Sequence, residues 1–415
     1  MRAMVLVMAG VLTAAGPEKG DAPFAFRDVA EETGLMPQVG GIRGHAAGWG
    51  DADGNGWIDL YVGTFHNEGS KANMFFRNEG GRFRLDGQKS VGISTRANSG
   101  LFADFDNDGD LDLYVASMPG VVKGDIMAPC TLFRNDGGGT YVNVAEGNGA
   151  CPAEGFAGRS AAALDFDGDG LLDLLVGDCV FKMYKGRRTS RLFRNKGGLQ
   201  FEDVSTDVGL PSGIPGLGVA AGDVNNDGWP DVFIASREGG NRLFLNDGKG
   251  KFREAACSPT LFDWNPPAKS DDSPAGAVFG DVNRDGLLDL VIGQHYSTPW
   301  KSPVAVRLYL NRGIESGEPR FEDVTEAVGL DPLFIKAPHV EIQDFDNDGW
   351  PDISTSIVKF AGKTPHPVIF RGLGVRDGLP RFRDSSAGVN DFPTADDRSK
   401  SVRASHSAWR SVART

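Results

Sequence analysis

The stretch at residues 104–116 reads DFDNDGDLDLYVA, an acidic loop followed directly by a run of β-forming residues. Its first nine residues follow the pattern D-x-[DN]-x-[DN]-G-x-x-D, which occurs six times in the chain. The copies begin at Asp51, Asp104, Asp165, Asp223, Asp281 and Asp344. Successive copies start 53, 61, 58, 58 and 63 residues apart, a period typical of propellers and other repeat arrays. The pattern therefore indicates six copies of one structural unit.

Each unit contains four short segments with strand character. An apolar segment such as SGLFA precedes the loop, and a β-rich run such as DLYVA follows it. A third segment, of the type TLFRN, comes after a variable stretch, and a glycine-rich turn leads to a fourth, of the type YVNVA. Short β-rich runs separated by turn residues predict antiparallel strands, and no extended helical periodicity interrupts them. We therefore expect an all-β protein whose units are the four-stranded blades of a β-propeller.

The two ends of the repeat region predict an incomplete seventh blade. Residues 26–34, FRDVAEETG, match the fourth strand of a unit but precede the first loop. A closed propeller lets a strand from one terminus complete the blade made by the other, which removes open strand edges. The partners of that strand would have to follow residue 384, where residues 391–415 read as an irregular basic tail or a truncated blade. A six-bladed ring is the alternative.

The acidic loop has the composition of a calcium site. Side chains at positions 1, 3, 5 and 9 and the backbone carbonyl at position 7 supply only oxygen, and hard oxygen ligands favour calcium over zinc or copper. Glycine at position 6 permits the sharp turn. The predicted ligands, in loop order, are Asp51, Asp53, Asn55, Trp57 and Asp59; Asp104, Asp106, Asp108, Asp110 and Asp112; Asp165, Asp167, Asp169, Leu171 and Asp173; Asp223, Asn225, Asp227, Trp229 and Asp231; Asp281, Asn283, Asp285, Leu287 and Asp289; and Asp344, Asp346, Asp348, Trp350 and Asp352.

Two other interpretations of the loop are disfavoured. An EF-hand loop needs an acidic ligand at position 12 and a helix after it, whereas position 12 here is valine, isoleucine or threonine within a predicted strand. A metal-free Asx-turn hairpin explains one such loop, but six copies in the same register argue against it. We expect the calcium mainly to hold each blade together, with direct bridging of a ligand through the metal as the alternative.

The charge and composition of the chain fit this interpretation. The formal net charge is −13. Asp fills twenty-one and Asn three of the twenty-four side-chain positions at 1, 3, 5 and 9 of the loops. Six divalent cations would add twelve positive charges and leave about −1. No basic stripe suits a nucleic acid, so we expect no nucleic-acid partner.

The N-terminus has the pattern of a secretory signal peptide, with a basic start, an apolar run at residues 3–15 and small residues at its end. The run is too short to span a bilayer, and no later segment is apolar enough to do so. A buried N-terminal element is the alternative. We expect a signal peptide at 1–15, a linker at 16–23 and a propeller at 24–390. The protein would be secreted, periplasmic or on the cell surface.

The four cysteines, Cys130, Cys151, Cys179 and Cys257, are compatible with an oxidising compartment. Sequence alone leaves their connectivity open. The predicted fold places Cys151 and Cys179 near one face of the third repeat, which favours that pair.

The end of the propeller opposite the acidic loops gathers cationic and aromatic residues. Those predicted to bind a ligand are Arg43, His45, His66, Arg159, Arg237, His295 and His339, with Arg96, Asn98, Asp178, Tyr296 and Lys359 nearby. They suit an anionic or sugar-like ligand, and an ordinary polar rim of strand ends is the alternative. No nucleophile or zinc motif accompanies them. We therefore expect a non-enzymatic binding or adhesion module for an extracellular protein or glycan, with a carbohydrate-active lyase or hydrolase as the alternative.

The sequence resembles the FG-GAP/VCBS repeat family. The resemblance rests on the aspartate loops, the LFRN segments and the motif F-x-D-V-[TS]-x-x-x-G-L at residues 201–210 and 321–330. More narrowly, it resembles the ASPIC/UnbV group of secreted proteins related to cartilage acidic protein. The resemblance covers residues 24–384 and implies an integrin-α-like β-propeller, usually seven-bladed, with calcium in the loops between first and second strands. The ASPIC/UnbV module of that group does not follow in this sequence, so functions tied to it are not carried over.

Overall fold

The computed structural model describes residues 29–42, 44–65, 70–118, 130–152, 156–178, 189–236, 240–258, 260–262, 273–296, 301–355 and 368–385. Across these ranges the chain forms twenty-four β-strands and no helix. In the same ranges, no helix that could cross a membrane is found. The prediction of an all-β protein is confirmed.

The strands form six four-stranded antiparallel sheets within the described residues, each in sequence order. The first two are β1 Gly44–Gly50, β2 Asp59–Thr64, β3 Met74–Asn78 and β4 Phe83–Leu85, then β5 Arg96–Ala103, β6 Asp112–Met118, β7 Cys130–Asn135 and β8 Tyr141–Asn143. The next two are β9 Gly158–Leu164, β10 Asp173–Asp178, β11 Arg191–Asn195 and β12 Phe201–Asp203, then β13 Gly216–Gly222, β14 Asp231–Ser236, β15 Arg242–Asn246 and β16 Phe252–Glu254. The last two are β17 Ser273–Gly280, β18 Asp289–His295, β19 Arg307–Glu315 and β20 Glu318–Asp323, then β21 Val340–Gln343, β22 Asp352–Thr355, β23 Val368–Arg376 and β24 Leu379–Asp384.

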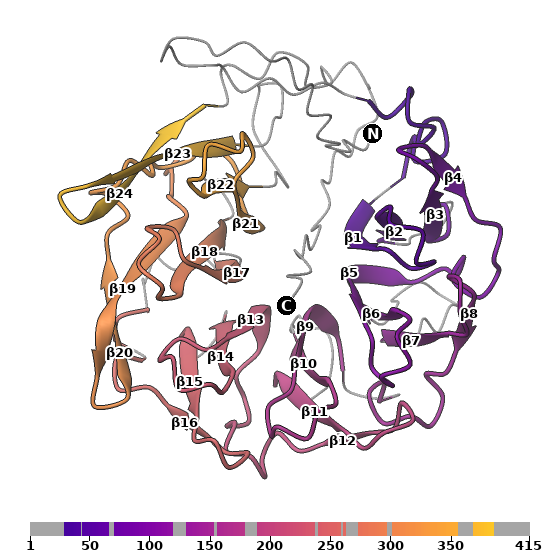
Figure 1. Ribbon diagram of the computed structural model, residues 1–415, viewed down its shortest axis with the longest axis horizontal. Coiled ribbons are helices and arrows are strands. Elements are labelled where there is room, and N and C mark those ends of the chain that lie inside the picture. Colours follow the sequence, from indigo (N-terminus) through magenta and orange to yellow (C-terminus); the bar gives the residue numbers. More distant parts are fainter. Residues whose placement is uncertain are drawn as a thin grey trace.

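The sheets are arranged radially around a central axis, with the first strand of each sheet innermost and the fourth outermost (Figure 1). Successive first strands contact one another, from β1 to β5, β9, β13, β17 and β21. This is the arrangement of propeller blades. The first and sixth sheets stand further apart than any two successive sheets in Figure 1.

Apolar residues between successive sheets form the core. Tyr61 of β2 and Phe75 of β3, both 0–1% exposed, pack in one cluster with Phe102 and Leu113 of the second sheet. Near the axis the strands converge so closely that some positions of the first strands have no room for a side chain. A Cβ atom on Gly218 would lie 2.2 Å from the carbonyl oxygen of Ala275 on the next first strand. The second strands, buried along their length, and the small residues of the first strands therefore both follow from blade packing.

Several predictions fall on residues outside the described ranges and stay predictions. They are the signal peptide and linker at 1–23, the propeller ends at 24 and 390, and the tail or seventh blade at 391–415. The prediction of a strand at 26–34 is wrong for residues 30–34, which form turns. Residues 26–28 lie outside the described ranges. The turn follows from the bonds that Thr33 makes to the carbonyl oxygen of Val29, at 2.8 Å from both its N–H and its hydroxyl.

The favoured cysteine pair also stays a prediction, because Cys179 lies outside the described residues. Among the described cysteines, Cys130, Cys151 and Cys257 are free thiols. Cys151 packs against the cluster that contains Cys130.

Candidate metal centres and the opposite face

Each acidic loop joins the end of a first strand to the start of a second strand, so all six described loops lie at the same end of the propeller. Within a loop the carboxylate at position 1 organises the turn. Asp104 accepts hydrogen bonds from the N–H groups of Asp108, at 3.2 Å, and Gly109, at 3.0 Å. The matching bonds in the other loops measure 2.8–3.1 Å. The first aspartate is thus wrapped by the backbone of its own loop.

The glycine at position 6 is required by the backbone conformation. In the six loops its φ lies between 85° and 94°, a region that L-residues other than glycine rarely adopt. The prediction that this glycine permits the turn is confirmed by the geometry.

The aspartate at position 9 is fully buried and clamps the loop to the sheet. Asp112 accepts hydrogen bonds from the N–H of Phe105 at position 2, at 3.1 Å, and from the N–H of Asn135 at the end of the third strand, at 2.9 Å. The same two bonds, 2.6–3.1 Å long, occur in the other five loops. Burial raises the pKa of Asp59 to about 6 and the pKa values of the other five to about 7. Each of these carboxylates is therefore a structural clamp, whatever else it binds.

The carboxylates of a loop converge on one point. Oxygen atoms of Asp51, Asp53 and Asp59, at positions 1, 3 and 9, lie within 4.8 Å of one another. The third loop brings the same positions together, and the second and sixth loops bring together positions 1, 3 and 5. In the fourth and fifth loops, position 3 is an asparagine. Two of the converging groups leave buried carboxylate oxygens without a hydrogen-bond donor, Oδ1 of Asp106 and Oδ1 of Asp167. An all-oxygen set with unsatisfied buried oxygens fits a hard divalent cation such as calcium.

The backbone N–H of position 7 donates a hydrogen bond to the side chain of position 5. The N–H of Trp57 donates to Oδ1 of Asn55 at 2.7 Å, and the N–H of Asp110 donates to Oδ1 of Asp108 at 2.9 Å. The Trp57 side chain is 49% exposed. The predicted role of the position-7 carbonyl as a ligand stays a prediction.

Asparagine side chains connect neighbouring loops, a feature that the sequence reasoning missed. Asn135, which ends β7, donates from Nδ2 to the carbonyl oxygen of Ala52 in the preceding loop, at 2.8 Å. Asn195, Asn246 and Asn311 make the same bond to the loop before theirs, at 2.6–2.8 Å. The signal is the repeated asparagine of the LFRN segments, which by sequence alone marks only the end of a strand.

At the opposite end, the structure brings some of the predicted ligand-binding residues together. The ring of His45 lies 4.5 Å from that of Phe65, and the Arg96 guanidinium lies 4.6 Å from the same Phe65 ring. Arg159 donates to Oδ1 of Asn98 at 2.9 Å. These residues come from the starts of β1, β5 and β9 and the end of β2, and together they form what we term the inner cationic cluster.

The other predicted residues of this end are separated from that cluster by sequence and by sheet. His295 ends β18, and His339, just before β21, lies 2.9 Å from Oε1 of Glu341. Arg43, His66, Arg237 and Lys359 lie outside the described residues. His45, Asn98, Asp178 and Tyr296 are buried, at 6% exposure or less. Half of the described set therefore lies beneath the surface.

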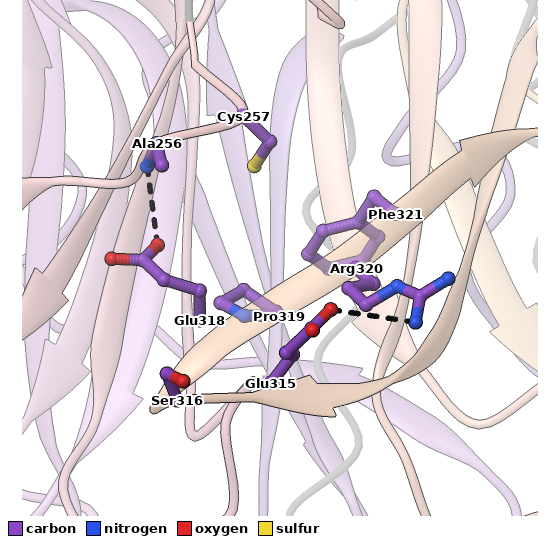
Figure 2. A pocket seen from close by; sticks show the side chains of 8 residues that line it. All are labelled: Ala256, Cys257, Glu315, Ser316, Glu318, Pro319, Arg320 and Phe321. Atoms are coloured by element: carbon purple, nitrogen blue, oxygen red, sulfur yellow. Dashed lines mark hydrogen bonds and ion pairs between the residues drawn. The ribbon is translucent and has the colours of Figure 1, made fainter.

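A groove of about 570 Å³ lies on the outer rim, between the turn after β16 and the β19–β20 hairpin (Figure 2). Its carboxylates are already engaged. Glu318 accepts a hydrogen bond from the N–H of Ala256 at 3.1 Å, and Glu315 pairs with Arg320 at 3.5 Å. We assign no ligand to this groove.

Comparison with known proteins agrees with the repeat geometry. A family model described as FG-GAP-like repeat matches residues 26–115, 124–176, 179–234 and 223–292. The chain belongs to this FG-GAP-like repeat family. The chain is also 27% identical over 300 residues to cartilage acidic protein 1 of Mus musculus and 28% identical over 300 residues to that of Homo sapiens. Each alignment covers 69% of this chain, which spans only 43% and 42% of the length of these relatives.

A solved structure, that of the V. cholerae biofilm matrix protein Bap1, aligns with 83% of this chain and 66% of its own, at 12% identity and a TM-score of 0.38.

Proposed function

We propose that this FG-GAP propeller is an exported, calcium-stabilised binding or adhesion module for an extracellular protein or glycan. The observation that supports it best is the convergence of loop carboxylates, with oxygens within 4.8 Å of one another in four loops. Carboxylates held this close repel one another strongly without a cation. A divalent cation in each loop removes that repulsion, and its role here is structural.

The size of the effect follows from mass action. A metal that binds only the folded state stabilises it by about 2.7 kcal/mol per site at 100 times its dissociation constant. Several such sites together would make folding depend on calcium. In this scheme the loop carboxylates hold the metal, while the position-9 aspartates transmit its effect to the second and third strands through their two backbone hydrogen bonds.

The calcium proposal is tested by thermal unfolding of the whole chain in excess chelator, in calcium and in magnesium. We expect a large rise in melting temperature in calcium and a smaller rise in magnesium, which demands a more regular geometry than these loops offer. Direct titration should then show several calcium ions bound per chain. An unchanged melting temperature on chelation contradicts the proposal.

The ligand is proposed to bind at the end opposite the metal loops, around the inner cationic cluster. The supporting observation is the half-buried Arg96 guanidinium stacked on the Phe65 ring, with the buried His45 ring against the same phenylalanine. A cation on an aromatic face suits anionic groups or sugar rings. The test is binding to a glycan array and to a panel of extracellular matrix proteins, with and without calcium. Arg96→Ala should lose binding, while Arg320→Ala on the outer rim should keep it.

A polysaccharide-degradation screen on the same preparation separates binding from catalysis. We expect binding without product. Release of product from any polysaccharide would replace the binding module with a carbohydrate-active enzyme.

A further inference from the structure

In each third strand, the residue just before the asparagine, or before Gly372 in the sixth unit, changes together with position 3 of the acidic loop. Where position 3 is aspartate, the third strand carries an arginine, and where position 3 is asparagine, it carries a leucine. The arginine pairs are Asp53 with Arg77, Asp106 with Arg134, Asp167 with Arg194 and Asp346 with Arg371. The leucine pairs are Asn225 with Leu245 and Asn283 with Leu310. The rule holds in all six units, although the two positions are 20 to 28 residues apart.

In three units the arginine touches the loop carboxylate directly. Arg194 Nε lies 2.8 Å from Oδ2 of Asp167, and its guanidinium stacks 5.1 Å from the Phe166 ring. Arg371 Nη2 lies 2.7 Å from Oδ2 of Asp346 and 3.0 Å from Oδ2 of Asp348. These are ion pairs with mostly buried side chains, between 14% and 32% exposed.

In the first unit the arginine also reaches the next sheet. Arg77 Nη1 donates to Oδ2 of Asp53 at 3.2 Å and to the carbonyl oxygen of Gly138 at 2.7 Å. Its Nε donates to Asp86 at 2.6 Å. The arginine thus fixes one oxygen of position 3 and leaves the other, Oδ1, facing the loop, where it accepts the N–H of Asn55 at 3.2 Å.

The second unit keeps the arginine without the direct contact. Arg134 pairs with Asp136 at 2.6 Å, and its side chain is 43% exposed. This unit is therefore a natural control for the other three.

In the fourth and fifth units the asparagine supplies its own donor. Nδ2 of Asn225 lies 2.9 Å from Oδ2 of Asp227, and Nδ2 of Asn283 lies 2.8 Å from Oδ2 of Asp285. With the charge of position 3 removed, the third strand carries leucine, and both Leu245 and Leu310 are fully buried. An arginine would here have no carboxylate at position 3 to pair with.

The consequence is a constant charge at the metal loop. Counting the side chains at positions 1, 3, 5 and 9 with the third-strand residue, loops two to six each carry a net charge of −3. Loop one carries −2, because position 5 is Asn55. Charge is a main determinant of the affinity of an oxygen site for calcium.

We propose that the third-strand arginines Arg77, Arg194 and Arg371 are resident counter-ions that position the third loop carboxylate and set the calcium affinity of their loops. The inference rests on the proposed calcium function. Without the arginine, the loop has one more net negative charge. Its calcium-free form is then less stable, and its calcium affinity is higher. Without the aspartate, the arginine is an unpaired cation that opposes calcium.

The experiment uses the full chain and a double-mutant cycle on the third unit, with Arg194→Leu, Asp167→Asn and both together. The double variant reproduces the pairing that the fourth and fifth units already contain. Urea unfolding is measured in chelator and in excess calcium, and the difference reports the calcium-linked stability. We expect Arg194→Leu to unfold at lower urea in chelator and to tighten calcium binding about tenfold, which corresponds to about 1.4 kcal/mol of added calcium-linked stability.

The matching expectations are that Asp167→Asn weakens calcium binding and that the double variant returns close to wild type in both conditions. Arg134→Leu is the matched control, because that arginine makes no direct loop contact, and we expect a clearly smaller change. Equal effects of Arg134→Leu and Arg194→Leu, or stability changes of the two single variants in chelator that simply add in the double variant, would overturn the proposal.

Failure of the calcium function itself is separately visible. If wild type shows no calcium-linked stability, the proposed function is wrong. The coupling between Arg194 and Asp167 in chelator then still decides whether the pair acts as one unit, and an absent coupling there overturns the positioning role as well.

Discussion

The fifth and sixth sheets each carry an acidic loop of the same pattern. They differ in the composition of the face that is directed away from the preceding sheet. In each of the first five sheets, the third residue of the second strand is apolar, fully buried and packed on the next sheet. These residues are Tyr61, Tyr114, Leu175, Phe233 and Val291. In the sixth sheet the same position is Ser354, which is half-buried and lies opposite Glu341 of the neighbouring strand β21.

The difference separates the two roles that a blade can play. Val291 lies in one cluster with Ile353 and Phe370, so the fifth sheet gives an apolar face and the sixth receives it. The other face of the sixth sheet carries the buried Ile369 beside Ser354, Glu341 and Arg371, and Arg371 pairs with its own loop. A seventh blade packed on this face would therefore meet a more polar seam than the other five.

The largest expected effect on the free energy of unfolding comes from placing the sixth-sheet residue at the fifth-sheet position, and the reverse change is its partner. Val291→Ser removes buried apolar surface and places a hydroxyl in the seam, which should cost about 2–3 kcal/mol of unfolding free energy. Ser354→Val should change it by less than about 1 kcal/mol, as substitutions outside a packed seam usually do. Urea unfolding in calcium measures both. Equal losses in the two variants would mean that the sixth sheet is packed on both faces like the others.

A second prediction compares the ends of the second strands in different sheets, through the pH dependence of stability. At the end opposite the loops, the second strands finish on or near Thr64, Ser117, Ser236 and Gln294, whereas β10 finishes on a buried acid, Asp178. Burial raises the pKa of Asp178 to about 7, and Arg191 and the Ala157 N–H offset this only in part. The folded protein then holds a proton that the unfolded chain loses near pH 4, so stability falls as the pH rises from about 4 to about 7.

Asp178→Asn removes that penalty and keeps an acceptor for the Ala157 N–H, which lies 3.3 Å from Oδ1. We expect the variant to be more stable than wild type by about 1–3 kcal/mol at pH 8 and nearly equal at pH 4. Thermal unfolding across this range measures the difference. The exposed Asp207→Asn is the control and should show no such trend, and a pH-independent gain for Asp178→Asn would argue against the titration.

The parts of the fold that could be predicted are those encoded locally. The six loops, the four strands of each unit and the need for glycine at position 6 follow from patterns within a dozen residues, and the structure confirms them. The strand predicted at 26–34 is wrong for residues 30–34, because the chain turns after Val29, as the same motif does after β12.

The missed features depend on contacts between distant segments. The burial of His45 and Asn98 depends on how six first strands converge at the axis, which no single repeat encodes. The role of Arg194 depends on a third strand lying beside the loop of its own unit. That contact is signalled by the paired changes at two positions across the six units, but only the fold explains why those positions meet.

The smallest expected difference in stability between the fifth and sixth sheets comes from the asparagine side chain that bonds to the preceding loop. Asn311 in the fifth sheet donates to the carbonyl oxygen of Val224 in the loop before it, whereas the sixth sheet has Gly372 at this position. A Cβ atom on Gly372 would lie 2.3 Å from the Pro351 carbonyl oxygen, so glycine is required there. Asn311→Gly copies the sixth sheet into the fifth and should cost about 1–2 kcal/mol, mainly from one lost buried hydrogen bond. If the loops act as a connected ring, the variant should also weaken calcium binding in the fourth loop, next to Val224. A loss of stability that is the same in chelator and in calcium would instead mean that the asparagine holds the sheets together and has no effect on calcium binding.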